Sequence, residues 1–220
     1  VDDALQRATS GETDIQPLAT NTGSCGENVT WSLSNDGVLT ISGTGAMTDY
    51  DSEYNTPWNS QKSSIQKVVV ETGVTTIGTN ALNNCTALES VSLPSTLTAI
   101  GNAAFYNCTS LKAVTIPEGV TSIGTDTFKN CNQLAEIVLP DSMISIGGHA
   151  FDRCSALEKI ELPDNVISLG EYAFSECSSL TTARLSDNLT ELSSHLFSQC
   201  KKLESVNMPS KLQVVGDFAM

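Results

Sequence analysis

The segment 111–133 reads LKAVTIPEGVTSIGTDTFKNCNQ, and its pattern returns every 23 residues through most of this 220-residue chain. Six of the seven cysteines keep this spacing without a slip: Cys85, Cys108, Cys131, Cys154, Cys177 and Cys200. Aligned on these cysteines, the repeats begin at Ile65, Leu88, Leu111, Leu134, Leu157, Leu180 and Leu203. A fixed period of this size is typical of a solenoid, in which stacked copies of one unit bury faces that none could bury alone.

Each repeat opens with a short predicted strand. Its first position is Leu in six repeats, and its fourth and sixth positions are apolar or small, so that alternate side chains point inward. A proline closes the strand in five repeats, at Pro94, Pro117, Pro140, Pro163 and Pro209. A second apolar segment follows, and it ends in a glycine at position fourteen, replaced only by Ser193. Glycine at this position suits a tight corner or a close backbone approach.

Position eighteen is the most regular apolar column. It contains Phe105, Phe128, Phe151, Phe174 and Phe197, with Leu82 and Met220 as aliphatic substitutes at the ends. We expect this column to form a core spine, in a short helical turn that ends in Cys. The period lies in the range of leucine-rich repeats, about 20 to 29 residues. The predicted fold is therefore an α/β leucine-rich repeat solenoid with a curved, strand-rich, parallel sheet.

The cysteine column allows two interpretations. Stacked strands lie about 4.8 Å apart, a Cα separation that a disulfide would accept. Residues in one column project in parallel, however, which keeps their Cβ atoms beyond the usual 3.5 to 4.5 Å of a disulfide. We therefore favour a reduced, buried ladder over disulfides. A zinc ladder is disfavoured because the chain has no C-x-x-C pair.

Three regions follow from the pattern. Residues 1–24 are polar and aperiodic and are predicted to be a disordered arm or spacer, as expected after removal of a signal peptide. Residues 25–64 are predicted to form a β-hairpin cap, with a turn at Asp36 and Gly37 and with Trp31 and Trp58 as core residues. Residues 65–220 are the solenoid of about seven repeats, the last incomplete and without a visible cap.

The repeat I-P-x-x-V-x-x-I-G-x-x-A-F-x-x-C-x-x-L, as in IPEGVTSIGTDTFKNCNQL, resembles the BspA-like leucine-rich repeats of bacterial cell-surface proteins. The segment CGENVTWSLSNDGVLTISGTGAM is similar to the lead-in before such repeats in secreted proteins of gut bacteria. This resemblance covers residues 25 to 220. It implies adhesion to host matrix proteins, host cells or other bacteria, but it carries no ligand-binding motif onto this chain.

Charge narrows the classes of partner. The net charge of −14 opposes binding to nucleic acid and to anionic membrane surfaces. No apolar run approaches the ~18 residues of a membrane span, so no membrane insertion is expected.

No catalytic or cofactor-binding constellation appears in the sequence. His149 and His195 share position sixteen with Tyr172 between them, about 10 Å apart, and are interpreted as surface residues that cannot share a metal. Asp141, Asp164 and Asp187 form a column that is interpreted as a solvated rim, with a weak calcium site as the alternative. We expect neither an enzyme nor a cofactor or metal.

Function is then expected on the open, concave side of the strands, at positions three and five of each repeat. The candidate partner-binding residues are Lys67, Val69, Ser90, Ser92, Thr115, Glu136, Val138, Lys159, Glu161, Thr182 and Arg184. Glu136 is expected to neutralise Lys159, and Glu161 to neutralise Arg184.

The predicted function is a non-enzymatic adhesion module, outside the cell or at its surface, that binds a protein or glycan. The alternative is a structural spacer or a self-association element, acting through the uncapped C-terminal end. With so few anchoring side chains, contacts are expected to be weak or multivalent.

Overall fold

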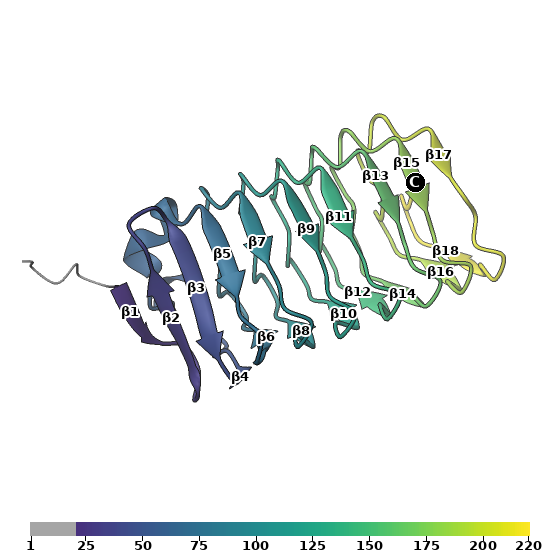
Figure 1. The fold of residues 1–220 in the computed structure, drawn as a ribbon. Helices are drawn as coiled ribbons and strands as arrows, with labels where there is room; N and C mark the ends of the chain where they lie inside the picture. Colours follow the sequence, from purple (N-terminus) through teal and green to yellow (C-terminus); the bar gives the residue numbers. More distant parts are fainter. Residues whose placement is uncertain (1–20) are drawn as a thin grey trace, which may run out of the picture.

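The computed structural model describes residues 21–220 as one elongated stack of coils (Figure 1). Most of the predicted arm, residues 1–20, lies outside the described residues. Strand β1 (Asn21–Ser24) pairs antiparallel with β2 (Val29–Leu33), so the ordered chain begins before the predicted boundary at residue 25. The described residues contain no helix long and apolar enough to span a membrane.

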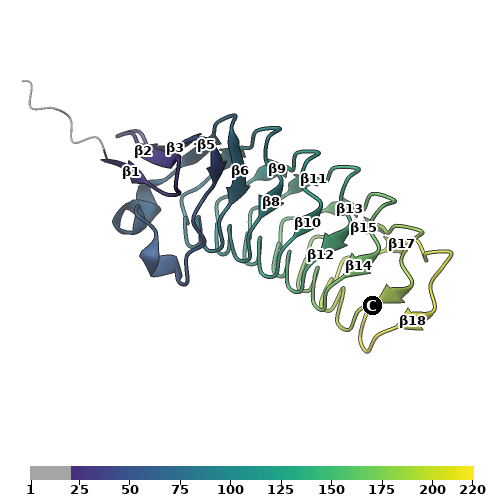
Figure 2. The ribbon, with the colours of Figure 1, turned by 90° about the horizontal axis from the view of Figure 1, so that it is seen from below.

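The first strand of each repeat forms one row along the molecule. It consists of β5 (Lys67–Val70), β7 (Ser90–Ser92), β9 (Ala113–Thr115), β11 (Glu136–Val138), β13 (Lys159–Glu161), β15 (Thr182–Arg184) and β17 (Ser205–Val206). A second row follows the proline turns, as Figure 2 shows, and is made of β6 (Val74–Ile77), β8 (Ala99–Ile100), β10 (Ser122–Ile123), β12 (Ser145–Ile146), β14 (Ser168–Leu169), β16 (Glu191–Leu192) and β18 (Val214–Val215). Where neighbouring strands of a row pair, they pair in parallel; the sequence predicted this for the first row and only an apolar segment in place of the second.

The core lies between the two rows. The predicted phenylalanine spine is confirmed: the five rings from Phe105 to Phe197 are buried and stack face to face, with centroids 5.1 to 5.7 Å apart. Leu82 continues this column in the core, whereas Met220 is 55% exposed and does not. The expectation that Met220 joins the spine is therefore wrong, because no further coil covers it in the described residues.

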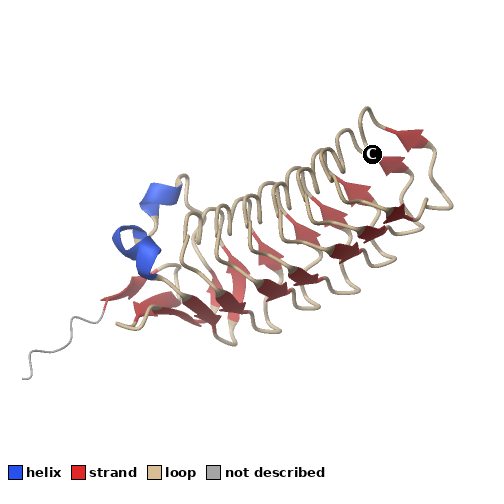
Figure 3. Cartoon of the chain, turned by 90° about the horizontal axis from the view of Figure 1, so that it is seen from above, coloured by secondary structure: helices blue, strands red, loops and turns tan. Residues whose placement is uncertain are grey.

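The turn around each phenylalanine is not helical, which corrects a prediction. Residues at positions sixteen and twenty adopt positive φ, for example Asp126 (φ 56°) and Asn130 (φ 62°), and this conformation interrupts a right-handed helix. Alternate N–H groups donate to the next coil instead, as from Phe128 to the Ala150 carbonyl (2.8 Å). The described helices are two short 3-10 segments near the N-terminal end, η1 (Glu53–Asn55) and η2 (Asn59–Ser64), drawn in blue in Figure 3.

The predicted glycine column reflects close backbone approach. These glycines do not have positive φ; a Cβ on Gly78 would lie only 1.9 Å from the Thr48 carbonyl oxygen, and one on Gly170 2.2 Å from the Gly148 nitrogen. At the exception, the Ser193 hydroxyl donates to the Leu169 carbonyl. Adjacent coils are therefore packed backbone to backbone at this corner.

The predicted hairpin is present at the start of the described chain. Strand β2 pairs antiparallel with β3 (Val38–Gly43), and β3 pairs in parallel with β5, so the hairpin continues the first row. The short strand β4 (Gly45–Ala46) similarly precedes β6. Trp58 is fully buried and its indole N–H donates to the Ala81 carbonyl (3.0 Å), which confirms a core role for this residue. Trp31 packs edge-on against it at 5.7 Å. A capping role for residues 25–64 remains a prediction.

The first row is not one continuous sheet, contrary to expectation. A seven-stranded sheet runs from β1 to β11, and a separate three-stranded sheet comprises β13, β15 and β17. Pairing in the second row continues across this point, since β12 pairs with β14, and it is interrupted later, between β14 and β16. Each break is therefore confined to one row, and the facing row is paired across it.

Candidate functional site

The predicted partner-binding residues lie on the outer side of the first row, and we call this surface the strand face. Within each strand the burial alternates: Ala113 and Thr115 are exposed around buried Val114, and Lys159 and Glu161 around buried Ile160. The alternation arises because successive strand residues point to opposite sides of a sheet. The predicted candidates are therefore brought onto one face, all of them exposed except half-buried Val69.

The charges on this face pair differently from the prediction. Lys159 Nζ lies 3.0 Å from Glu161 in its own strand, and the Arg184 guanidinium lies 2.9 Å from Asp164. The Arg184 guanidinium also donates to the Leu162 carbonyl (3.1 Å). Glu136 makes no ion pair within the described residues, because β11 and β13 are not paired and Lys159 turns along its own strand. Both expected cross-strand pairs are thus wrong, although Glu161 and Arg184 are register partners.

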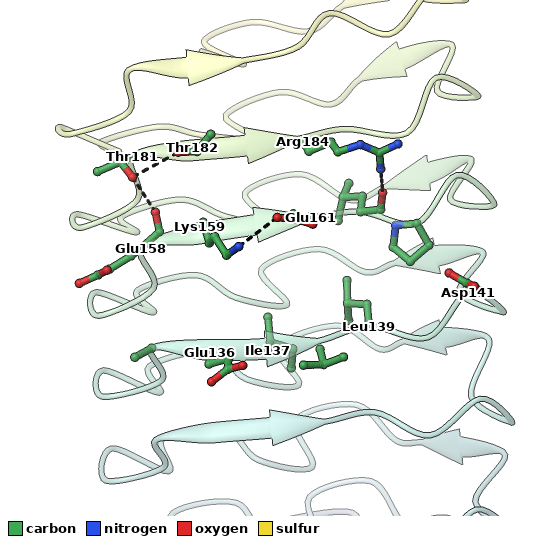
Figure 4. Close-up of a pocket in the computed structure, with 14 residues that line it drawn as sticks. Glu136, Ile137, Leu139, Asp141, Glu158, Lys159, Glu161, Thr181, Thr182 and Arg184 are labelled. Carbon is green, nitrogen blue, oxygen red and sulfur yellow. Dashed lines mark hydrogen bonds and ion pairs between the residues drawn. The ribbon is translucent and has the colours of Figure 1, made fainter.

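A cleft of about 740 Å³ lies at the break between β11 and β13 (Figure 4). Ile137, Val138 and Leu139 line one side, and Lys159, Glu161 and Leu162 line the other. Ile137 and Leu139 are partly exposed, as Val91 and Leu93 are in the repeat of β7, whereas the matching Val114, Ile116, Ile160 and Leu162 are at most 3% exposed. The opening therefore uncovers part of the apolar layer beneath the strand face. This cleft could not be predicted from the residue pattern, because repeats four and five carry the usual residues at their inward positions.

Position sixteen holds a second feature that sequence reasoning missed. His149, Tyr172, His195 and Phe218 stack in one column with centroids 4.7, 4.4 and 5.1 Å apart. Their φ angles of 54° to 58° set the same backbone geometry in each repeat and so align the rings. Both histidines are half-buried rather than simply exposed. The signal was a column of three aromatic or imidazole rings followed by Phe218 at the same position.

The calcium site considered for the aspartate column finds no support in the described residues. Within residues 21–220, no group of three or more His, Cys, Asp or Glu side chains could hold a metal ion. In the aspartate column, Asp164 binds Arg184, and its main-chain carbonyl accepts from Ser186 and Asn188. This carbonyl is thus used by the fold itself.

Comparison with known proteins agrees with this architecture. Residues 59–142 and 121–220 match the BspA type leucine rich repeat region, in six copies. None of the curated proteins compared with the chain matches it significantly. A leucine rich repeat protein from T. pallidum is similar in crystal structure, with 29% identity, a TM-score of 0.68, and coverage of 88% of this chain and 85% of that one.

Two further crystal structures resemble the chain. A leucine-rich repeat protein from Bacteroides ovatus is 26% identical over 88% of this chain and 55% of that one, with a TM-score of 0.60. A leucine rich cell surface protein from Faecalibacterium prausnitzii is 24% identical over 89% and 72%, with a TM-score of 0.50, and shows the fold. The family match spans most of the chain, and the coils repeat the same phenylalanine and cysteine positions. This chain therefore belongs to the BspA type leucine-rich repeat proteins.

Proposed function

We propose that this protein is a non-enzymatic binding module that presents its strand face to a protein or glycan on a host or bacterial surface. The observation that supports this most is the strand face itself, where exposed positions three and five repeat at regular spacing above a buried core. A rigid row of exposed side chains can contact an extended partner at many points. The proposed location is outside the cell or at its surface, in keeping with the family.

The proposal is tested by two matched substitutions in one repeat. Thr115 lies on the strand face, and Thr121 lies exposed beside the second row. Binding is measured to immobilised matrix proteins, to glycans and to whole bacteria. Thr115→Lys should lower the affinity for the surface ligand that is captured at least several-fold. Thr121→Lys should leave capture unchanged. Equal losses in both variants, with melting curves intact, would remove the strand face as the binding surface.

A second candidate is self-association through the last coil. Val214, Val215 and Phe218 are 51%, 58% and 74% exposed there, which is unusual for large apolar side chains. Sedimentation velocity tests this alternative: the unmodified protein should show a concentration-dependent dimer, and Val215→Lys should abolish it. A monomer over the whole concentration range contradicts self-association.

A further inference from the structure

The break between β11 and β13 leaves backbone hydrogen-bonding groups free on both sides of the cleft. Elsewhere the Ile116 N–H donates to the Val138 carbonyl (2.9 Å), and the Leu162 N–H to the Arg184 carbonyl (2.8 Å). The equivalent bond, from Leu139 to Glu161, is not formed in the described residues. At the other end of the cleft, the bond from the Glu158 N–H to the Ala135 carbonyl is also missing in the described residues. Neighbouring repeats form this bond, from the Ala135 N–H to the Lys112 carbonyl and from the Thr181 N–H to the Glu158 carbonyl.

The fold satisfies such groups in most other repeats. In the last pair of strands, the Asn207 side chain accepts from the Leu185 N–H (2.6 Å) and donates to its carbonyl (3.0 Å), completing the pattern. Strands β7 and β9 share a single register pair, yet the Lys112 to Glu89 backbone bond (3.3 Å) still joins them. Between β11 and β13, by contrast, neither the backbone bond at the start of the strands nor the one at their end is formed in the described residues.

These groups match the backbone of an extended peptide. On one side of the cleft lie the Leu139 N–H and the Ala135 carbonyl. On the other side lie the Glu158 N–H and the Glu161 carbonyl. From residue 135 to residue 139 a strand advances about 13 Å, the length of a segment of four or five residues. Added strands are recognised in this way, through main-chain bonds with pockets for alternate side chains. A glycan is less suited, because no aromatic ring lines the cleft to stack on a sugar.

Charge selects the kind of peptide. Four acidic residues line the cleft against two basic ones: Glu136, Asp141, Glu158 and Glu161 against Lys159 and Arg184. Both basic groups are already paired, with Glu161 and Asp164, whereas Glu136, Glu158 and Asp141 make no ion pair within residues 21–220. Since an incoming acidic segment would meet unpaired carboxylates, electrostatic complementarity favours a basic one.

We infer that the cleft between β11 and β13 is the main subsite of the strand face and takes an extended, basic peptide segment. This inference rests on the proposed binding function and names its partner. The segment places its backbone against the free groups of Leu139 and Glu158, an apolar side chain over Ile137 and Leu139, and cationic side chains beside Glu136 and Glu158. The charged residues that line the cleft and face this segment are Glu136, Asp141, Glu158, Glu161, Lys159 and Arg184.

The test uses a labelled, amidated pentapeptide, Lys-Val-Lys-Val-Lys, and fluorescence anisotropy. Glu158→Lys should weaken binding about tenfold or more. Glu204→Lys is the matched control, since Glu204 occupies the same exposed position two repeats away and lies outside the cleft; it should change affinity less than twofold. A peptide N-methylated at alternate amides keeps the charge but loses donors, and should bind at least tenfold more weakly.

Equal losses in Glu158→Lys and Glu204→Lys, or full binding of the N-methylated peptide, would show general attraction to an acidic protein and overturn the inference. Absence of peptide binding would overturn it as well. Neither result affects the proposed function if Thr115→Lys still weakens capture of a surface ligand while Thr121→Lys does not. Loss of that difference defeats the proposed function, whatever the peptide does.

Discussion

At the scale of single residues, the cysteine column is explained by a hydrogen bond that five of its six thiols, those of Cys108, Cys131, Cys154, Cys177 and Cys200, donate to a carbonyl of the previous coil. Cys131 Sγ lies 3.2 Å from the Phe105 carbonyl, and Cys154 Sγ lies 3.3 Å from the Phe128 carbonyl. The side chain must be small enough to lie between coils and must carry a donor, and Cys meets both needs while tolerating burial. The predicted burial is confirmed for five of these six cysteines; Cys200 is half-exposed.

The oxidation state of the cysteines remains a prediction, and a thiol count tests it. Denatured protein prepared without reductant should release seven free thiols, because all seven cysteines are unpaired in the fold. In the native protein Cys200 should react first, since it is partly exposed and its pKa is lowered by its contact with the Cys177 thiol. A count of five or fewer would contradict the reduced ladder.

Stability should fall steeply in alkali. Burial raises the pKa of Cys85 and Cys131 from 9.0 to about 12. Below pH 9 these thiols are protonated in both states; between pH 9 and 12 only the unfolded chain ionises, so their contribution is progressively lost. In this range each such thiol lowers the free energy of unfolding by up to about 1.4 kcal/mol per pH unit. Urea unfolding at several pH values should show a shallower decline in Cys131→Ala, and an unchanged slope would refute this linkage.

The phenylalanine spine gives a paired test of packing. Phe151 stacks on both sides, with ring centroids 5.4 and 5.3 Å apart, whereas within residues 21–220 Phe197 stacks only on Phe174. Phe151→Ala should lower the free energy of unfolding by about 3 to 5 kcal/mol, because locked neighbours cannot fill the void. Phe197→Ala should cost less, since the last coil can relax. Chemical denaturation measures both, and equal losses would argue against nearest-neighbour stacking.

At the scale of elements, Gly147 and Gly148 allow the effect of close coil packing on stability to be compared with the effect of backbone flexibility in the unfolded chain. A Cβ on Gly147 would lie 2.7 Å from the Gly124 carbonyl carbon and the Thr125 nitrogen, while one on Gly148 would have its nearest neighbour at 3.4 Å. Gly147→Ala should destabilise by about 1 to 3 kcal/mol, because backbone must shift. Gly148→Ala should be neutral or stabilise by up to about 1 kcal/mol through a less flexible unfolded chain. Thermal and urea unfolding compare them, and similar values for both variants would contradict the close approach.

Also at this scale, the break between β11 and β13 changes which charges are available. From the sequence, Lys159 and Arg184 are expected to be neutralised by Glu136 and Glu161 of neighbouring strands. In the structure Lys159 pairs with Glu161 in its own strand and Arg184 pairs with Asp164, so Glu136 is left without an ion pair in the described residues. The available charge in the cleft is negative, and the preferred partner is accordingly basic.

At the scale of the whole molecule, the chain carries a net charge of −14, and its described residues form an elongated stack of coils (Figure 1). Like charges repel at low ionic strength, and salt screens them over a Debye length of about 8 Å at physiological concentration. The melting temperature should therefore rise by a few degrees between about 10 and 150 mM NaCl. Sucrose of equal osmolality serves as the control. A melting temperature that falls with salt would mean that attractive pairs such as Arg153 with Glu176 dominate.

Sequence alone determined the repeat, the parallel first row of strands, the phenylalanine and cysteine columns, the hairpin and the outward strand positions. All of these follow from periodicity, since residues 23 apart must occupy the same place in successive coils. It failed at the helical turn, because the left-handed residues at Asp126 and Asn130 are imposed by bonds to the next coil. The ion partners of Lys159 and Arg184 and the cleft beside β11 were decided only by tertiary structure. They depend on which neighbouring strands pair and on which way each charged side chain turns, and repeats with the same residue pattern do not distinguish these outcomes.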